Sequence, residues 1–335
     1  MVRKMFGKDD AAFKGLPRTL QQAMMEDLSI AQLRAASPLP EDTQRVIDQA
    51  VVSVGMDRLV VVDDFISAGL TYPLTDPLSV MFVQWDNVAR SGFAKRTMNP
   101  AARGENQLPD RSQNRVPIYI TSDDFFFGIR TLKASQRVGA PLDITMVEQA
   151  TRNVNEAIED AMLNGIDFNV DGYTAYGLLN APNHNTITYG SNEAWDASGH
   201  DGQDILDDVL RMVDELQEDR RFGPYNLYVP TTYGNKLNND FKTNGDISIL
   251  ARLQQIVAGG RNLVVKTADQ LPANKTVMVQ MTRDVADVID GQAPVVVPWT
   301  SNDGFTLYWL VMAIMVPRVK TDSNDASGIV VGYPT

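Results

Sequence analysis

The chain has 335 residues, 44% of them hydrophobic, and a formal net charge of −12 at pH 7. This length can hold one large domain or two ordinary ones, with enough hydrophobic residues for a sizeable core. The acidic charge argues against a dedicated nucleic-acid binder, whose affinity depends on Lys and Arg side chains that neutralise phosphates. Because no cysteine is present, disulfides and thiolate metal sites are excluded.

The chain shows no pattern that would direct it into or across a membrane. Residues 1–17 lack the apolar core of a signal peptide. The longest apolar run, residues 305–316, is too short for a helix that crosses a bilayer and is typical of a buried strand. We therefore expect a soluble protein that is made inside the cell and has no membrane partner.

Residues 1–55 resemble an arm more than a domain. One short amphipathic helix is expected there, with an apolar stripe of Leu20, Met24, Leu28 and Leu33. Prolines 38 and 40 end it, because each pushes the preceding residue out of helical space. The stripe must be buried on the chain's own domain or on a neighbouring subunit, and the sequence leaves both alternatives open.

Residues 59–65 (LVVVDDF) read as a strand, and residues 80–121 read as an extended β-hairpin. The polar connection of the hairpin, residues 97–111, has almost no side chains that could enter a hydrophobic core. The hairpin is therefore expected to project onto another molecule. The alternative is a disordered surface loop. Its excess of basic side chains would complement an acidic partner. The candidate inter-subunit contacts on it are Arg90, Lys95, Arg96, Arg103, Arg111 and Arg115.

Residues 141–165 predict one long helix. Thr145 and Glu148 form a capping-box pattern at its start, and Gly165 supplies a left-handed stop. Apolar residues at three- and four-residue spacing predict its buried face: Val147, Ala150, Val154, Ala157, Ile158, Ala161 and Met162. The acidic side chains expected to meet a neighbour's basic hairpin are Glu148, Glu156, Glu159 and Asp160.

The second half alternates helices and strands irregularly, which indicates an α+β fold with at least two packed units. A helix is expected over residues 203–221, with Ile205, Leu206, Val209, Leu210, Val213 and Leu216 on its buried face. Shorter helices are expected over residues 231–237 and 247–257. The strands are expected at residues 225–229, 263–266, 276–281, 295–297, 305–316 and 329–331.

No catalytic, cofactor or metal site emerges from the motifs. Residues 167–172 copy the first half of an EF-hand loop, but Leu178 stands where a bidentate Glu is needed. The two histidines, His184 and His200, have no third ligand at a suitable spacing. Adjacent aspartates such as those at 207 and 208 are usually solvated on a helix. Neither a phosphate-binding glycine loop nor a serine nucleophile elbow is present.

The order of these parts resembles the tailed-phage major capsid fold (the Hong Kong ninety-seven-like fold), which encapsulins share. The stretches that carry the resemblance are VPIYIT (116–121), DFFFGIR (124–130), GAPLD (139–143), YGLLN (176–180), FGPY (222–225), Trp299 and Pro317-Arg318. Their order along the chain is similar to that in encapsulin-related capsid proteins, and the resemblance covers nearly all residues after about 45.

The resemblance implies an N-terminal arm (1–55), a connection (56–79) and an extended loop (80–121). It further implies a peripheral domain with the spine helix (122–171), an axial domain (172–298) and closing peripheral strands (299–335). The implied function is a virion capsid protein that self-assembles, in the host cytoplasm, into an icosahedral shell of pentamers and hexamers around double-stranded DNA. Portal, scaffolding and decoration proteins are the implied partners, and the packaged DNA would be contacted only weakly.

Two other functions fit parts of the sequence. An encapsulin-type bacterial compartment would enclose an enzyme cargo in place of DNA. An α+β hydrolase with paired carboxylates would form a small particle and lose activity when a single Asp is changed.

Overall fold

The computed structural model describes residues 51, 59–88, 96, 98, 111–130, 145–190, 193–242, 245, 247–258, 261–300, 305–321 and 326–334. It is a mixed α+β fold that divides into two compact units. The first unit draws on residues 1–81, 118–162 and 288–316, and the second on residues 82–117, 163–287 and 317–335. The predicted N-terminal helix lies outside the described residues.

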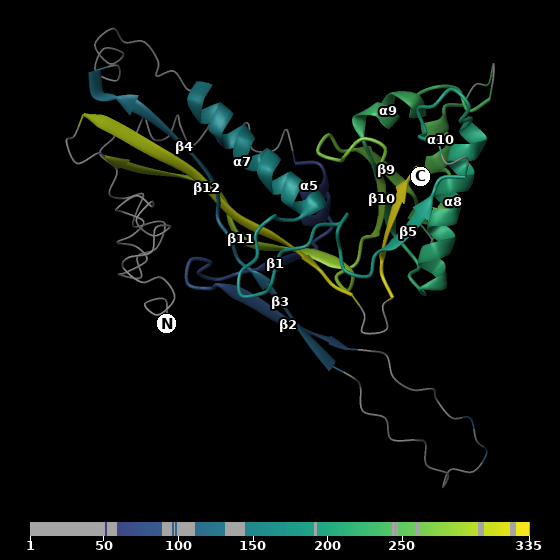
Figure 1. Ribbon diagram of the computed structural model, residues 1–335, viewed down its shortest axis with the longest axis horizontal. Helices are drawn as coiled ribbons and strands as arrows, with labels where there is room; N and C mark the ends of the chain where they lie inside the picture. The colour runs from purple at the N-terminus through teal and green to yellow at the C-terminus, as the bar shows by residue number, and fades with distance from the viewer. Residues whose placement is uncertain are drawn as a thin grey trace. The chain divides into compact units, whose positions relative to one another are not determined.

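A four-stranded sheet forms the first unit (Figure 1). Its order is β1-β11-β12-β4, with β1 at Thr71–Pro73, β11 at Ala286–Thr300, β12 at Thr306–Val319 and β4 at Thr121–Gly128. β1 runs parallel to β11, whereas β4 runs antiparallel to β12. The apolar run predicted as a strand is therefore β12, and most of its residues are buried.

Helix α7 (Thr145–Asn164) lies beside β4 and β12 in the same unit (Figure 1). The Asn153 side-chain amide donates a 2.7 Å hydrogen bond to the Asp123 carboxylate of β4. Every residue of the predicted apolar face is buried except Ala157, which is exposed. Gly165 follows the helix with φ +76°, the left-handed stop that the sequence predicted.

The prediction of a strand at residues 59–65 is wrong, because residues Val61–Ser67 form helix α5. The β-branched run favours a strand locally, but tertiary contacts reverse that preference. Val61, Val62 and Phe65 are buried on one side of the helix. The side chain of Glu159 on α7 accepts hydrogen bonds at the N-terminus of α5, which a strand could not present to it.

The second unit contains a five-stranded sheet of order β5-β13-β10-β6-β9 (Figure 1). The strands are β5 (Asn185–Thr188), β13 (Ile329–Tyr333), β10 (Thr276–Gln280), β6 (Tyr225–Val229) and β9 (Val264–Thr267). β10 is antiparallel to both of its neighbours, β13 and β6, while β5 and β9 lie parallel at the edges.

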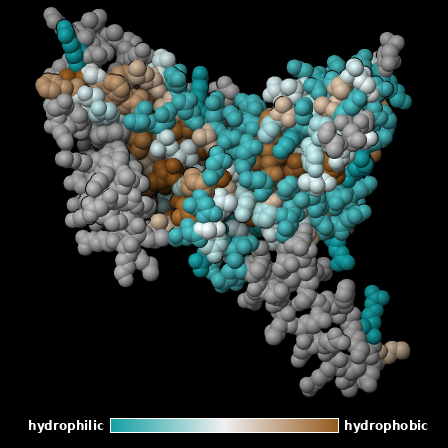
Figure 2. Space-filling view, viewed as in Figure 1, coloured by the Kyte–Doolittle hydropathy of each residue, from teal (hydrophilic) through white to brown (hydrophobic). Residues whose placement is uncertain are grey.

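Helices α8 (Gly202–Glu218), α9 (Thr231–Leu237) and α10 (Ile249–Gln254) enclose one hydrophobic core with this sheet. The helix predicted at 231–237 and the strand predicted at 225–229 have the bounds that the sequence indicated. On α8, however, Leu210 is exposed and Met212 is buried, so the core face is rotated from the one expected. In Figure 2 the surface over α8 is mostly hydrophilic, whereas hydrophobic residues gather over β11 and β12 of the first unit.

Strands β2 (Phe82–Val88) and β3 (Arg111–Pro117) pair as an antiparallel hairpin. The hairpin was expected to extend to residue 121, but β3 ends at Pro117, and residues 118–120 lead to β4. β3 is therefore more polar than predicted, since its sequence is RSQNRVP. A second, very short hairpin joins β7 (Val257–Ala258) to β8 (Arg261–Asn262), so the helix expected over residues 247–257 is shorter than predicted.

Candidate functional site

The β2–β3 hairpin is the first candidate site, because it has no core of its own. Among the described elements, its two strands make extensive contacts only with each other. Val83 and Val116 face each other across the pair and are buried, whereas Gln84 and Arg115 face each other on the opposite side and are exposed. A polar strand pair of this kind gains its remaining contacts from something outside the hairpin.

The predicted basic residues of the hairpin are only partly placed by the structure. Arg96 is exposed, Arg111 begins β3, and Arg115 lies exposed near the end of β3. Arg90, Lys95 and Arg103 lie outside the described residues. Of these six side chains, the structure therefore describes only those of Arg96 and Arg115.

Tyr173 packs on one face of the hairpin root, by which we mean the paired residues 82–85 and 114–117. Its ring lies 6.3 Å from that of Phe82 in an edge-to-face arrangement, and the Arg115 guanidinium carbon lies 5.7 Å from its ring centroid. Both distances are typical of favourable aromatic and cation–π contacts. Tyr173 closes a two-residue turn in which its backbone exchanges two 2.9 Å hydrogen bonds with Val170.

Arg318 packs on the other face of the hairpin root. It contacts Trp85, whose side chain points to the opposite face of β2 from those of Phe82 and Gln84. The Arg318 guanidinium carbon lies 5.7 Å from the centroid of a Trp85 ring. The same guanidinium donates two hydrogen bonds to Asp287, Nε to Oδ1 at 2.7 Å and Nη2 to Oδ2 at 2.5 Å. Lys320 adds a 2.7 Å bond to Asp287 Oδ2, so two cations share this buried carboxylate.

The acidic residues of α7 form the second candidate site, with one correction. Glu148 and Glu156 are half-buried and Asp160 is exposed, so these three reach the helix surface. Glu159 lies eleven residues after Glu148, about three full turns, and belongs to the same stripe. It is nevertheless fully buried, because α5 covers it.

The Glu159 carboxylate binds inside its own subunit. Oε1 accepts from the backbone N–H groups of Val60 and Val61 at 3.2 and 2.7 Å, and Oε2 accepts from Val62 at 3.2 Å. These are the free amides at the start of α5, where a negative charge also opposes the positive end of the helix dipole. Glu159 is therefore not available as an inter-subunit contact.

Asp208 is a buried polar centre that the sequence did not predict. The Trp195 indole N–H donates to its Oδ2 at 2.9 Å, and His200 Nε2 lies 3.2 Å from the same oxygen. Its Oδ1 accepts from the Gly190 N–H at 2.9 Å and from the Arg211 guanidinium. This set of donors explains why an aspartate on α8 can be buried, and it holds Gly190, Trp195 and His200 against that helix.

The tyrosines beside this centre are strongly shielded from water. Burial raises the pKa of Tyr189 well above its usual value, the hydrogen bond with the Thr276 hydroxyl offsets part of this rise, and Tyr233 and Asp208 add smaller increases. Burial likewise raises the pKa of Tyr233 to about 12. Both rings pack on Trp195, so the centre is an ordered aromatic and polar core.

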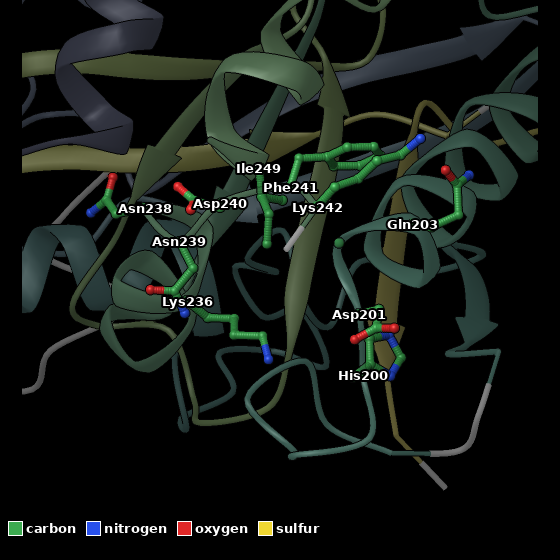
Figure 3. A pocket seen from close by; sticks show the side chains of 11 residues that line it. His200, Asp201, Gln203, Lys236, Asn238, Asn239, Asp240, Phe241, Lys242 and Ile249 are labelled. Carbon is green, nitrogen blue, oxygen red and sulfur yellow. The ribbon is translucent and has the colours of Figure 1, made fainter. Parts of the chain in front are cut away.

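A polar cleft of about 720 Å³ opens near the start of α8 (Figure 3). His200, Asp201 and Gln203 line it on one side, and Lys236 and residues 238–242 line it on the other. Among the described residues, no Ser, Thr or Cys lines this cleft, so this part of its wall holds no hydroxyl or thiol nucleophile. In the described ranges, no three His, Asp or Glu side chains gather as metal ligands, and no helix is both long and apolar enough to cross a membrane.

The contacts at the hairpin root were missed by the sequence reasoning. Trp85 was predicted as part of the hairpin at 80–121, and Tyr173 and Arg318 were not linked to that hairpin. The one usable signal was the Pro317-Arg318 pair, which belonged to the capsid resemblance but carried no assigned role. Tyr173 and Arg318 lie 145 residues apart, so their joint position depends on the tertiary fold.

Comparison with known proteins identifies both a family and a fold. Residues 108–332 match the model of a protein family described as a family of unknown function (DUF6260). No curated protein sequence matches the chain.

Three solved structures show the fold to which the chain is similar. The virus-like particle protein from Pyrococcus furiosus is 17% identical, with a TM-score of 0.59 over 86% of this chain and 98% of that one. The capsid of Myoviridae Phage XM1 is 13% identical, with a TM-score of 0.58 over 76% and 86%. The capsid of an empty GTA particle is 14% identical, with a TM-score of 0.54 over 79% and 88%. The chain therefore has the major capsid protein fold that its sequence resembles.

Proposed function

We propose that this chain, which belongs to the family of unknown function DUF6260, is the shell-forming protein of a tailed bacteriophage. The proposal starts from its major capsid protein fold. Copies of the chain would assemble into an icosahedral shell of pentamers and hexamers that encloses double-stranded DNA. The observation that carries the proposal is the similarity to three particle proteins, which extends over more than three quarters of this chain.

The proposed working parts follow the capsid resemblance. Residues 1–55 would be the arm, 56–79 the connection, 80–121 the extended loop, 172–298 the axial domain, and 122–171 with 299–335 the peripheral domain. Function then consists of burying surface between copies, and no chemical step is involved. Each individual contact can be modest, because many identical contacts act together in a closed shell.

We propose that the hairpin's basic side chains lie against acidic residues of a neighbouring copy. The hairpin residues are Arg90, Lys95, Arg96, Arg103, Arg111 and Arg115. The surface residues of α7 that remain as partners are Glu148, Glu156 and Asp160; Glu159 is withdrawn because it is buried. Exposed ion pairs of this kind would fix register and orientation more than they would add affinity.

An encapsulin-type compartment is the second candidate, because the particle from Pyrococcus furiosus aligns over 98% of its own length. The two functions differ in what the shell holds. Nuclease-protected DNA together with a portal protein supports the phage capsid. A co-purified enzyme inside a DNA-free shell supports the compartment.

Expression of the full chain, alone and with the proteins encoded beside it, tests the proposal. Sedimentation and electron microscopy should show closed particles of uniform diameter. A chain that remains monomeric at high concentration and in the presence of its genomic neighbours would contradict the shell function. A structural role further implies that portal and scaffolding proteins join particles in the virion, while no enzymatic activity accompanies the purified subunit.

Charge reversal tests the hairpin contact separately. The change Arg96→Glu should reduce assembly, and the added change Glu148→Lys in the same chain should restore part of it. Arg252→Glu, on the exposed side of α10, is the matched control, because it alters net charge equally. Equal assembly by the Arg96 and Arg252 variants would contradict the contact. Deletion of residues 97–110 should abolish closed particles if the hairpin joins copies.

A further inference from the structure

The root of the β2–β3 hairpin is held on both faces by side chains that come from distant parts of the second unit. In an antiparallel pair, side chains alternate between faces along each strand. Phe82 and Arg115 therefore share one face, and Tyr173 contacts both of them. Trp85 lies on the opposite face, where Arg318 packs on its ring.

Tyr173 is a rigid contact, because its backbone position is fixed. Asp171 and Gly172 form the centre of its turn with φ +52° and +84°, values that define a tight two-residue turn. The turn is tied back to the end of α7, since the Ile166 N–H donates to the Ala175 carbonyl at 3.1 Å. The Thr174 hydroxyl donates a 3.0 Å bond to the Phe168 carbonyl in the same segment.

Arg318 is rigid for a different reason. Its planar guanidinium makes a two-pronged contact with Asp287 and stacks on Trp85 at the same time. Lysine could supply the charge but neither the fork nor the flat stacking surface. Lys320 donates to the same Asp287 Oδ2 that accepts from Arg318, and it also donates a 2.5 Å bond to the Arg283 carbonyl, so the carboxylate is held by both cations.

We infer that Tyr173 and Arg318 form a two-sided clamp that sets the direction in which the β2–β3 hairpin leaves the second unit. They are positioning residues: they need not touch a neighbouring copy, but they decide where the hairpin tip reaches. This inference rests on the proposed shell function for its consequence. The clamp itself is a property of the single subunit and can be measured there.

A small change in direction at the root matters because the hairpin is long. β2 alone spans seven residues, or roughly 23 Å at about 3.3 Å per residue. A tilt of roughly 10° at the root would move its far end by about 4 Å. That displacement is comparable to the spacing between adjacent strands, so inter-subunit contacts made by the tip would lose their register.

The test combines hydrogen–deuterium exchange on unassembled subunits with electron microscopy of assembled ones. The variants are Tyr173→Ala and Arg318→Lys, with Tyr173→Phe as the conservative rescue, since it keeps the ring. Tyr176→Ala is the matched control, because Tyr176 lies three residues further on and is similarly exposed, at 42% against 36% for Tyr173.

The clamp predicts roughly tenfold faster amide exchange in residues 82–88 and 111–117 of both variants, with β6 and β10 unchanged. Tyr173→Phe and Tyr176→Ala should exchange as the wild type does. Assembled at a temperature well below unfolding, the two variants should give particles of mixed diameter or open sheets.

Three results would overturn the inference. Unchanged amide exchange at the hairpin root in the Tyr173→Ala and Arg318→Lys variants would show that these residues do not form a clamp. Faster exchange throughout the second unit means that the residues act on general stability. Faster exchange at the root with particles of normal, uniform diameter means that the clamp does not govern docking. If the wild-type chain forms no particles, the shell function fails, and the exchange data still decide whether the clamp exists.

Discussion

Glu159 offers the most direct test of how the first unit is held together. Its buried carboxylate accepts three backbone N–H bonds at the start of α5, at 2.7 to 3.2 Å. The change Glu159→Ala would leave these donors without a partner in a place that has little access to water. Each unmet buried donor costs about 1–3 kcal/mol, and water that enters the vacated space offsets part of the loss.

We expect Glu159→Ala to destabilise the packing of α5 by about 3–5 kcal/mol. The change Glu159→Gln should cost about 2 kcal/mol, because the amide keeps one acceptor oxygen but turns an NH₂ group toward a backbone N–H. Glu156→Gln is the matched control on the same helix. Since Glu156 is only half-buried, its change should stay within about 0.5 kcal/mol.

Hydrogen exchange over residues 61–67 measures this local effect, because global unfolding of a chain with two units is not a simple two-state process. A loss of about 3 kcal/mol corresponds to roughly 100-fold faster exchange. The decisive observation is the order of the exchange rates over residues 61–67, which should be fastest in Glu159→Ala, slower in Glu159→Gln and slowest in the Glu156→Gln control. Equal protection of α5 in the Glu159→Ala and Glu156→Gln variants would refute the role of the carboxylate as the helix cap.

Three further predictions concern the second unit. Asp208→Asn should destabilise α8 by about 2–4 kcal/mol, measured by hydrogen exchange over residues 202–218, because an amide cannot accept all the hydrogen bonds that the carboxylate accepts. Asp207→Asn, on the exposed side of α8, should change little. Gly177→Ala should prevent soluble expression, since its Cβ would lie 2.4 to 2.6 Å from backbone atoms at the end of α7. Gly172→Ala is the control, because open space surrounds that position, and it should lower the free energy of unfolding by only about 1 kcal/mol. Burial alone would raise the pKa of Asp284, but the Thr282 hydroxyl and the Arg221 guanidinium lower it below its usual value. The melting temperatures of wild type and Asp284→Asn should therefore differ slightly at pH 7 and converge as the pH falls through the lowered folded-state pKa. A difference that does not depend on pH would contradict this prediction.

Elements whose pattern is local were predicted well from the sequence. β6 and α9 have their expected bounds because an apolar run is followed directly by Pro230, which separates the strand from the helix and is the N-cap residue of α9. α7 was predicted because its three- and four-residue apolar spacing extends over twenty residues. The α+β class followed from the same patterns.

Features that depend on contacts between distant segments were not predicted. The α5 sequence favours a strand until Glu159, almost one hundred residues away, supplies the cap for a helix. Asp208 was read as a solvated helix residue, because the donors that bury it come from the loop before α8 and from Arg211. The hairpin root depends on Tyr173 and Arg318, whose shared position no local spacing encodes.

The order of the strands in the second sheet has a consequence for biosynthesis. Among the described strands, β5 pairs only with β13, so the strand partner of residue 185 is residue 330, which is synthesised much later. At about 5–20 residues per second, a ribosome needs roughly 7 to 30 seconds to make the intervening stretch. During that interval the side of β10 that β13 will occupy stays uncovered on the nascent polypeptide. Chaperones and the pace of translation through this stretch should therefore decide how much of the newly made protein reaches its native form.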